Sequence, residues 1–383
     1  MICLSSITLR EISLPLKEPF RTADGVVDHR RVLLLEIHDK SGRSTWSECV
    51  AEATAGYSDE TVDTCWRVIS EQIAPGVIGR DFESPGEADA FLALEFPRAR
   101  MARAAIEMGV WALGSLETNL SLAALLNSHA RHPIVPRSHV AAGIAVGMQN
   151  DASALAERCR SAANEGYRRI KIKISPGRDV EYVGAVRNAV GIGISLSVDG
   201  NRSYSIERDD DLTALEALDD FDLSMIEQPL GDLESHSALQ RRISTPVCLD
   251  ESITSTSDVE RMLQLDSARI VNLKPGRVGG FTESIAIHDL CQNSGVPVWC
   301  GGMNETGIGR AYNVALASLP HFTLPGDLSP SSRYWNEDII SEPWTMDRLG
   351  NIEVPLDNIG IGVEVNTALI ERLTSREHTI TEP

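Results

Sequence analysis

SLSVDGN at 195–201, SMIEQP at 224–229 and VCLDES at 247–252 are three short apolar runs that each end in a carboxylate. Those carboxylates, spaced by 28 and 23 residues (227 − 199 and 250 − 227), are Asp199, Glu227 and Asp250. A strand, a helix and their two loops take about 25 to 30 residues in a βα unit. The three runs therefore predict consecutive parallel strands with helices between them.

The same spacing continues on both sides of these runs. Lys173 precedes Asp199 by 26 residues (199 − 173), and Lys274 follows Asp250 by 24 (274 − 250). Repeated βα units build a parallel barrel, and right-handed crossovers put all the strand ends on one face. We therefore predict strands that end near Val146, Ile174, Val198, Ile226, Leu249, Leu273, Trp299 and Leu324, and helices at Ala152–Glu165, Val180–Val190, Leu212–Leu218, Asp258–Leu265 and Glu283–Ser294.

An open, doubly wound sheet is the alternative fold for such a pattern. It would be expected to carry a glycine-rich phosphate turn after its first strand. The corresponding stretch, Gly143-Ile144-Ala145-Val146-Gly147, is a poor match. The barrel is therefore favoured.

The first third of the chain has a different pattern. Residues 1 to about 50 alternate like strands, with Val32–Ile37 as the most apolar run. From Ser58-Asp59-Glu60, a plausible helix cap, the pattern becomes helical, and Met101–Leu113 has apolar residues at helical spacing. This region is predicted to be α+β, with strands first and helices after.

Charge and composition exclude several classes of protein. The chain has 383 residues, 42% hydrophobic and 23% charged, with a formal net charge of −20. Nucleic acid and anionic membranes require a cationic face, so neither is expected as a partner. Seven cysteines without a C-x-x-C pair indicate reduced thiols in a cytoplasmic protein. The N-terminus lacks the shape of a signal peptide, and no apolar run has the length of a membrane span.

Three carboxylates that converge at one barrel face predict a metal site. Their mutual repulsion is relieved by a hard divalent cation, and oxygen-only ligands favour Mg²⁺, with Mn²⁺ as a substitute. A single Asp after a strand is more often a helix cap, but three in register are not explained that way. Asp250 is followed by Glu251, and strand alternation lets only one of the two point inward without deciding which.

Lysines lie beside these acids in the predicted barrel. Lys171 and Lys173 share one face of a strand, and Lys171 alone is explained by salt bridges to the carboxylates. A nearby divalent cation depresses a lysine pKa and so makes a general base near pH 7. The second and sixth strands lie roughly opposite each other, so Lys173 and Lys274 are predicted to address opposite faces of a metal-bound carboxylate. This arrangement suits removal of an α-proton through an enediolate.

The sequence resembles the enolase superfamily, in its muconate-lactonising branch, nearly end to end. It is most similar to the N-acylamino acid racemase / o-succinylbenzoate synthase family. The segments that carry the resemblance are Lys171–Lys173, Val198–Asn201, Ile226–Leu230, Cys248–Ser252, Asn272–Gly280 and Gly301–Arg310. The resemblance implies Asp199, Glu227 and Asp250 as metal ligands, Lys173 and Lys274 as the acid/base pair, and Glu251 as a neighbour of the ligands.

The resemblance also implies an architecture. It implies a TIM-type (β/α)7β barrel at 131–345, an α+β cap at 1–130, and a segment at 346–383 that returns to the cap. The loop Glu18–Thr22, with Phe20, and the region of Tyr57 would close over the substrate. The residues expected near the substrate or the ligands are Lys171, Asn201, Glu251, Phe20, Tyr57, Met303, Asn304 and Glu305.

Three places depart from the pattern of the family. An apolar residue is expected where Asn304 stands, and a smaller one where Arg202 stands. Residues 127–137 also lack the usual pattern before the first barrel strand. Asn304 and Arg202 are predicted at the barrel mouth, so they bear on which substrate is bound.

The expected activity is Mg²⁺-dependent racemisation of N-acyl (N-succinyl) amino acids, synthesis of o-succinylbenzoate, or both. Dipeptide epimerase and muconate cycloisomerase use the same two lysines and remain alternatives. Mandelate-type enzymes place a His at the end of the seventh strand, where this chain has Val298-Trp299-Cys300-Gly301. A non-catalytic binding protein would be expected to lose a ligand or base, and all five are present. The resemblance implies a small carboxylate substrate and a homo-oligomer.

Overall fold

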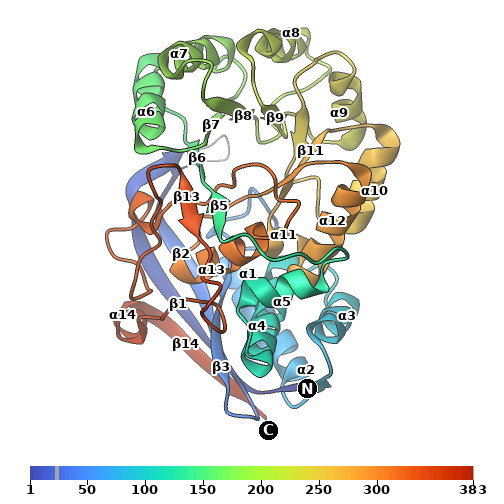
Figure 1. Ribbon diagram of the computed structural model, residues 1–383, viewed down its shortest axis with the longest axis vertical. Coiled ribbons are helices and arrows are strands. Elements are labelled where there is room, and N and C mark those ends of the chain that lie inside the picture. The colour runs from blue at the N-terminus through green and yellow to red at the C-terminus, as the bar shows by residue number, and fades with distance from the viewer. Residues whose placement is uncertain (22–25, 383) are drawn as a thin grey trace.

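Seven parallel strands form the larger of the two main sheets (Figure 1). The computed structural model describes residues 1–21 and 26–382. Strands that follow one another along the chain are hydrogen-bonded neighbours, as in a barrel wall. The predicted strand ends are confirmed at the first seven positions. The strands are β6 (Gly143–Val146), β7 (Arg169–Lys173), β8 (Ser195–Asp199), β9 (Met225–Glu227), β10 (Val247–Leu249), β11 (Ile270–Leu273) and β12 (Val298–Cys300).

The eighth position of the barrel is filled by an irregular segment, so the prediction of a regular strand ending near Leu324 is wrong. Phe322 forms a single parallel bridge to Val298 of β12, and Gly326 forms one to Ala142, just before β6. The backbone then turns, and the N–H of Asp327 donates to the Cys300 carbonyl at 2.9 Å. The segment therefore connects the first and last strands without a continuous ladder.

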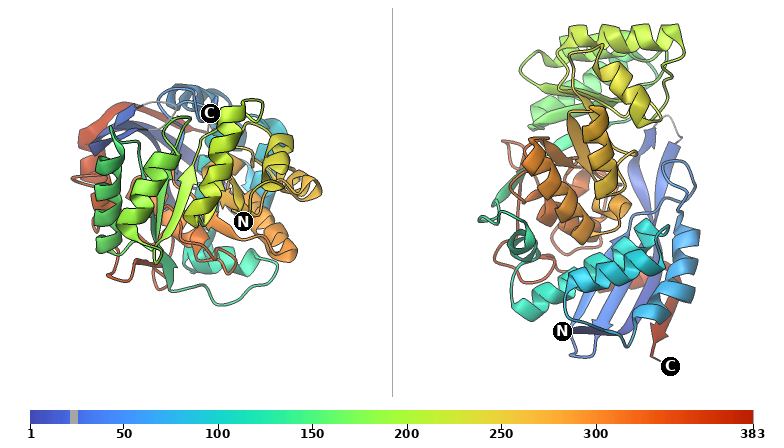
Figure 2. Two further views of the ribbon diagram at one scale, coloured as in Figure 1. Left: turned by 90° about the horizontal axis from the view of Figure 1, so that it is seen from above. Right: turned by 90° about the vertical axis from the view of Figure 1, so that its right-hand side faces the viewer.

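Helices alternate with the strands and cover the outside of the barrel (Figures 1 and 2). All five predicted barrel helices are confirmed, and Leu212–Leu218 corresponds to α8 with the start of the 3₁₀ turn behind it. The helices and turns are α6 (Ala152–Glu165), α7 (Val180–Val190), α8 (Asp209–Ala217), a 3₁₀ turn (Leu218–Phe221), α9 (Leu233–Gln240), α10 (Thr256–Leu265), α11 (Pro275–Val278), α12 (Phe281–Ser294), α13 (Gly307–Ala317) and a 3₁₀ turn (Ser331–Arg333).

An antiparallel sheet forms the cap, and the last strand of the chain is part of it. The strand order is β14-β1-β2-β3, so the C-terminal strand lies beside the N-terminal one (Figure 2). The described strands are β1 (Ile2–Arg21), β2 (Val26–Asp39), β3 (Ser44–Cys49), β4 (Asp81–Phe82), which pairs with β1, and β14 (Thr374–Thr381). A two-stranded sheet joins β5 (His139–Ala141) to β13 (Asn351–Glu353), and α14 spans Thr367–Leu373.

The run Val32–Ile37 is apolar on both sides because β2 lies between two cores. Val32 and Leu34 belong to the buried cluster that continues into the barrel. Leu33, Leu35 and Ile37 alternate with them and belong to the cluster under the cap helices. The sheet is therefore a layer between cap helices and barrel.

Most helices of the cap pack on the outer face of its sheet (Figure 2), whereas the last one, Leu122–His129, buries its apolar side chains in the cluster that continues into the barrel. The expected cap at Ser58 is wrong by one turn, because the Thr61 side chain caps α1 through a reciprocal pair with Thr64. The helices are α1 (Val62–Val68), a π-helical turn (Ile69–Ile73), α2 (Ala74–Val77), α3 (Pro85–Glu95), α4 (Arg100–Thr118) and α5 (Leu122–His129).

Two buried glutamates of the cap fix its position on the barrel. Glu107 of α4 accepts hydrogen bonds from the N–H groups of Phe281 and Thr282, which open α12. Glu48 of β3 accepts from the N–H groups of Thr306 and Gly309 at the start of α13. The first N–H groups of a helix lack partners inside it and carry partial positive charge. Each carboxylate therefore satisfies a barrel helix from the other layer.

Two further features concern the cysteines and the length of the helices. All seven cysteines are free thiols. Among the described residues, no helix combines the length and the apolarity needed to cross a bilayer.

Candidate active site

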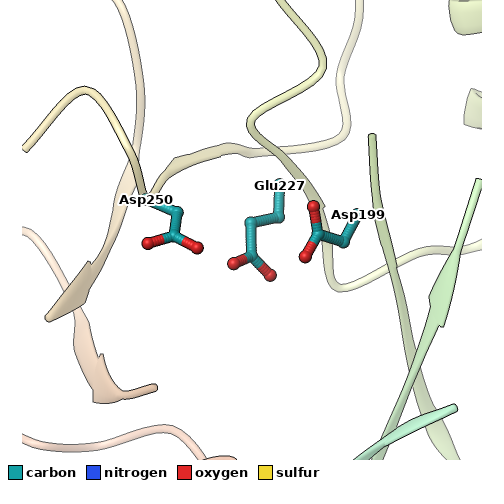
Figure 3. Close-up of side chains that lie close together, drawn as sticks. All are labelled: Asp199, Glu227 and Asp250. Carbon is teal, nitrogen blue, oxygen red and sulfur yellow. The ribbon is translucent and has the colours of Figure 1, made fainter. Parts of the chain in front are cut away.

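Asp199, Glu227 and Asp250 lie side by side at the ends of β8, β9 and β10, with Glu227 in the middle (Figure 3). One oxygen of each carboxylate lies within 4.8 Å of the other two. All three side chains are buried, with no more than 1% of any residue exposed. The predicted convergence of three carboxylates is therefore present, from strands that are adjacent in the sheet.

The two lysines at either side of this row pair with its outer members. Lys173 Nζ, at the end of β7, lies 2.6 Å from Asp199 Oδ2. Lys274 Nζ, directly after β11, lies 2.9 Å from Asp250 Oδ2. Because β7 and β11 flank the three acidic strands in the sheet, the ammonium groups stand at opposite ends of the row.

The alternation of β7 accounts for the position of a further cation. In Arg169-Ile170-Lys171-Ile172-Lys173, the basic residues share one face of the strand. Lys171 Nζ lies 2.8 Å from Glu227 Oε2 and 3.4 Å from Asp199 Oδ2. Lys171 therefore makes the salt bridges that the sequence predicted, below Lys173 in the barrel.

Burial and repulsion make the middle carboxylate hard to ionise. Burial, and next the charge of Asp199, raise the pKa of Glu227 to about 8. Burial opposes ionisation of Asp250 too, but Lys274 and Arg277 outweigh it and hold the pKa of Asp250 well below its usual value. Burial lowers the pKa of Lys274, but Asp250 and Tyr57 outweigh it and raise that pKa above the ordinary value.

Asp250 is held by residues from both layers of the molecule. Tyr57 of the cap donates its hydroxyl to Asp250 Oδ1 at 2.8 Å. Arg277 donates to the same Oδ1 and, at 3.0 Å, to the Tyr57 hydroxyl. The Tyr57 ring also lies over the Lys274 ammonium, 4.3 Å from its centre. Tyr57 therefore links the cap to a carboxylate and to a lysine at once.

A cavity of about 220 Å³ lies above this group of charges. Most residues expected near a substrate line it, including Phe20 and Tyr57 from the cap and Met303 and Asn304 after β12. Lys171, Lys173, Lys274 and Asn201 line it as well. Thr22 of the predicted closing loop lies outside the described residues. The cavity therefore combines apolar side chains from the cap with cations from the barrel.

Glu251 and Glu305, by contrast, do not line the cavity. Glu251 Oε1 accepts from Asn201 Nδ2 at 3.1 Å, beside the three acids. Burial and the charge of Asp250 raise its pKa to about 7. Glu305 lies behind the loop that follows β12, where it accepts from Asn313 at 2.7 Å and pairs with Arg310 at 3.3 Å. Both residues lie beside the site and not at its surface.

Left-handed backbone gathers at the mouth of the barrel. Of the seven non-glycine residues with positive φ in the described chain, four follow strands of the site: Asn201, Arg202, Gln228 and Asn304. Asn adopts this region more readily than most residues, so the φ of 56° at Asn304 gives a backbone reason for Asn at that position. Arg202 donates to the Gly56 carbonyl at 3.1 Å, which ties the mouth to the Tyr57 loop.

The sequence patterns missed Arg277 and Asp327. Arg277 lies on the short helix α11 after β11, outside the strand-end pattern. Asp327 lines the cavity at the end of the irregular eighth segment, three residues past Leu324. The rule that a polar residue closes each strand would have found Asp327, had it been carried to the eighth position.

Two family models match this chain over most of its length. The model for the mandelate racemase / muconate lactonizing enzyme N-terminal domain matches residues 5–127. The model for the enolase C-terminal domain-like family matches residues 154–369. The first match covers most of the cap, and the second contains all three carboxylates and both lysines.

Curated relatives match over nearly their whole length. The chain is 43% identical to the o-succinylbenzoate synthase of Bacillus subtilis, over all of both chains. It is 41% identical to the N-succinylamino acid racemase of an Amycolatopsis species, over 97% of this chain and 98% of the other. A crystal structure of an enolase-superfamily member from Listeria innocua superimposes over all of both chains, with a TM-score of 0.92 and 33% identity.

Proposed function

Because the chain belongs to the enolase superfamily, in the o-succinylbenzoate synthase / N-succinylamino acid racemase group of the mandelate racemase / muconate lactonizing enzyme family, we propose that it removes the α-proton of an N-succinylamino acid or of the o-succinylbenzoate precursor. The observation that carries this proposal is one arrangement of charges. Three buried carboxylates stand in a row with a lysine at either end, beneath a single cavity. This arrangement suits proton transfer beside a carboxylate.

The three carboxylates fit a divalent cation. All the donor atoms are oxygens, within reach of one another. Glu227 Oε2 lies close to Lys171 but accepts no well-aligned hydrogen bond from the described residues, so it has a lone pair for a cation. Oxygen donors of this kind favour Mg²⁺, with Mn²⁺ as a working substitute. When bound, the cation would stabilise the negative charge that develops on the substrate carboxylate as the α-proton leaves.

Lys173 and Lys274 are the acid/base pair in this proposal. Both ammonium groups line the cavity, and they stand at opposite ends of the carboxylate row. Each would exchange a proton with one face of the substrate α-carbon. The charge of Asp250 raises the pKa of Lys274, so neutralising that charge makes Lys274 a better base near pH 7.

The cap supplies the apolar part of the cavity. Phe20 and Tyr57 from the cap, with Met303 from the barrel, would contact the part of the substrate remote from the α-carbon. We divide the chain accordingly into a cap at 1–130, a catalytic barrel at 131–345 and a returning segment at 346–383. The proposal includes a homo-oligomer that acts in the cytoplasm.

One intermediate serves both reactions, so the product must be measured. The experiment incubates the chain with Mg²⁺ in D₂O and a panel of N-succinyl and N-acetyl amino acids, with hydrophobic dipeptides for comparison. We expect α-deuterium in the N-succinyl substrates, read by NMR, and a parallel assay reports o-succinylbenzoate. Absence of exchange on every acylamino acid, together with no o-succinylbenzoate, would contradict the proposal.

A further inference from the structure

Three cations are stacked along the inner face of β7, and each of them pairs with a carboxylate. Lys173, nearest the mouth, pairs with Asp199 at 2.6 Å. Arg169, at the bottom, is fully buried with its guanidinium over the Trp299 ring, 3.9 Å from the centre. Lys171 stands between them and lines the cavity. The anion that serves both Arg169 and Lys171 is Asp327.

Asp327 contacts both cations with separate oxygens. Its Oδ1 accepts from Arg169 Nη2 at 2.7 Å, and its Oδ2 lies 2.8 Å from Lys171 Nζ. Its backbone is fixed as well, because its N–H donates to Cys300 and its carbonyl accepts from Arg310 at 2.8 Å. The residue is only 6% exposed. Asp327 is therefore a rigid anion that is no member of the carboxylate row.

Lys171 has two kinds of anionic partner. One is Asp327, and the other consists of Glu227 at 2.8 Å and Asp199 at 3.4 Å. An ammonium group and a divalent cation compete for the same carboxylate oxygens. Without Asp327, the only carboxylates among the described residues left in contact with Lys171 would be two of the three proposed ligands.

We propose that Asp327 is a positioning residue that retains the Lys171 ammonium at the cavity wall, so that Glu227 and Asp199 stay available to the metal ion. The inference rests on the proposed metal site. It assigns Asp327 no contact with the metal. Its effect reaches the metal only through Lys171.

Binding of Mn²⁺ without substrate, measured by the loss of free-ion EPR signal, tests this directly. Asp327→Asn keeps the shape but loses the charge, so that Lys171 would pair with Glu227 and Asp199 alone. We expect its Mn²⁺ affinity to fall by about 10- to 100-fold, the range typical of changes in the surroundings of metal ligands. In Lys171→Met the competing ammonium is gone, and the affinity should equal or exceed that of the parent chain. Adding Asp327→Asn to Lys171→Met should then change the affinity by less than about threefold.

Each outcome decides the matter. Unchanged affinity in folded Asp327→Asn overturns the inference, and so does a tenfold loss when Asp327→Asn is added to Lys171→Met. If Asp327→Asn does not fold, Lys171→Met still decides, because Asp327 keeps Arg169 as a partner there. Weaker Mn²⁺ binding in Lys171→Met than in the parent chain would show that the ammonium assists metal binding, and it would overturn the inference. A parent chain that binds no Mn²⁺ would overturn the proposed metal site itself.

Discussion

Tyr57 connects the cap to the charged groups of the site through its hydroxyl. That hydroxyl donates to Asp250 and accepts from Arg277, while the ring covers Lys274. Tyr57→Phe keeps the ring and removes both hydrogen bonds. A hydrogen bond to a charged group contributes about 1.5–3 kcal/mol, and Asp250 keeps two other partners. We therefore expect kcat/KM for α-proton exchange to fall about tenfold, the low end of that range.

The matched control is Tyr204→Phe, which removes a buried hydroxyl that donates to Asp179 at 3.2 Å. Neither Tyr204 nor Asp179 lines the cavity. This control should lower the unfolding temperature and leave kcat/KM unchanged. An unchanged rate in Tyr57→Phe, or an equal loss in both variants, would contradict the role given to Tyr57.

At the residue scale, alternation along regular strands is what made the site predictable. Asp199, Glu227 and Lys173 close regular strands, so their direction followed from the pleat. Arg277 and Asp327 reach the site from a short helix and an irregular segment, whose side-chain directions no period fixes. Asp250, not Glu251, joins the row, a choice that the spacing alone left open.

Among the elements, α12 depends on a side chain from another layer. Glu107 of α4 accepts from both of its first N–H groups. Burial, and next the charge of Asp89, raise the pKa of Glu107 to about 7, from an ordinary 4.5. A carboxyl whose pKa is higher in the folded chain binds its proton more tightly there. Its contribution to stability is therefore full below about pH 4.5 and is lost as the pH rises through about 7.

Glu107→Gln tests this assignment. The amide presents an N–H group to N–H donors, so we expect a loss of about 1–3 kcal/mol of unfolding free energy. The fall of stability between about pH 4.5 and 7 should also become shallower, by up to about 1.4 kcal/mol per pH unit. Denaturation at several pH values measures both. Glu117→Gln, an exposed change on the same helix, is the control, and equal pH dependence in all three chains would sink the assignment.

The elements themselves were largely predictable, and the errors have physical causes. The helix at Ala152–Glu165 matched to the residue, because Asp151 caps it and the left-handed Gly166 ends it. Ser58 has the composition of a helix cap, but Thr61 caps the helix because it forms reciprocal hydrogen bonds with Thr64. The predicted eighth strand is absent, since the segment around Leu324 bonds to its neighbours through isolated bridges and forms no continuous ladder.

At the scale of the whole molecule, the β1–β2 ribbon of the cap is fastened to the barrel near the cavity. Glu18 pairs with Arg158 of α6 and lies 3.8 Å from Arg333. Phe20, two residues further on, lines the cavity. The pair is partly exposed, so it contributes at most about 1 kcal/mol to stability. If the pair stabilises the closed position of the ribbon over the substrate by the same amount, its loss would change KM about fivefold.

We therefore expect Arg158→Ala to raise KM about fivefold and to leave the unfolding temperature nearly unchanged. Steady-state kinetics and thermal denaturation measure the two effects. Arg160→Ala is the control, because Arg160 pairs with Glu157 of its own helix. An unchanged KM in Arg158→Ala, or the same rise in Arg160→Ala, would contradict a role for this contact in closing the cavity.

The overall architecture followed from two different parts of the sequence. The regular spacing of βα units predicted the barrel, since in each unit one helix buries the apolar outer face of one strand. The return of the last strand to the first sheet has no such period. It was expected only from the resemblance, and the pairing of Ile7 with Ile380 places that strand in the cap.

The central claim is that Lys173 and Lys274 act on opposite faces of one α-carbon. Exchange of the α-proton in D₂O, followed by NMR on each enantiomer of an N-succinyl amino acid, tests it most directly. The parent chain should exchange both enantiomers. Lys173→Ala and Lys274→Ala should each lose racemisation, and any exchange that survives should involve opposite enantiomers in the two variants. A variant that still racemises, or two variants that exchange the same enantiomer, would contradict the account.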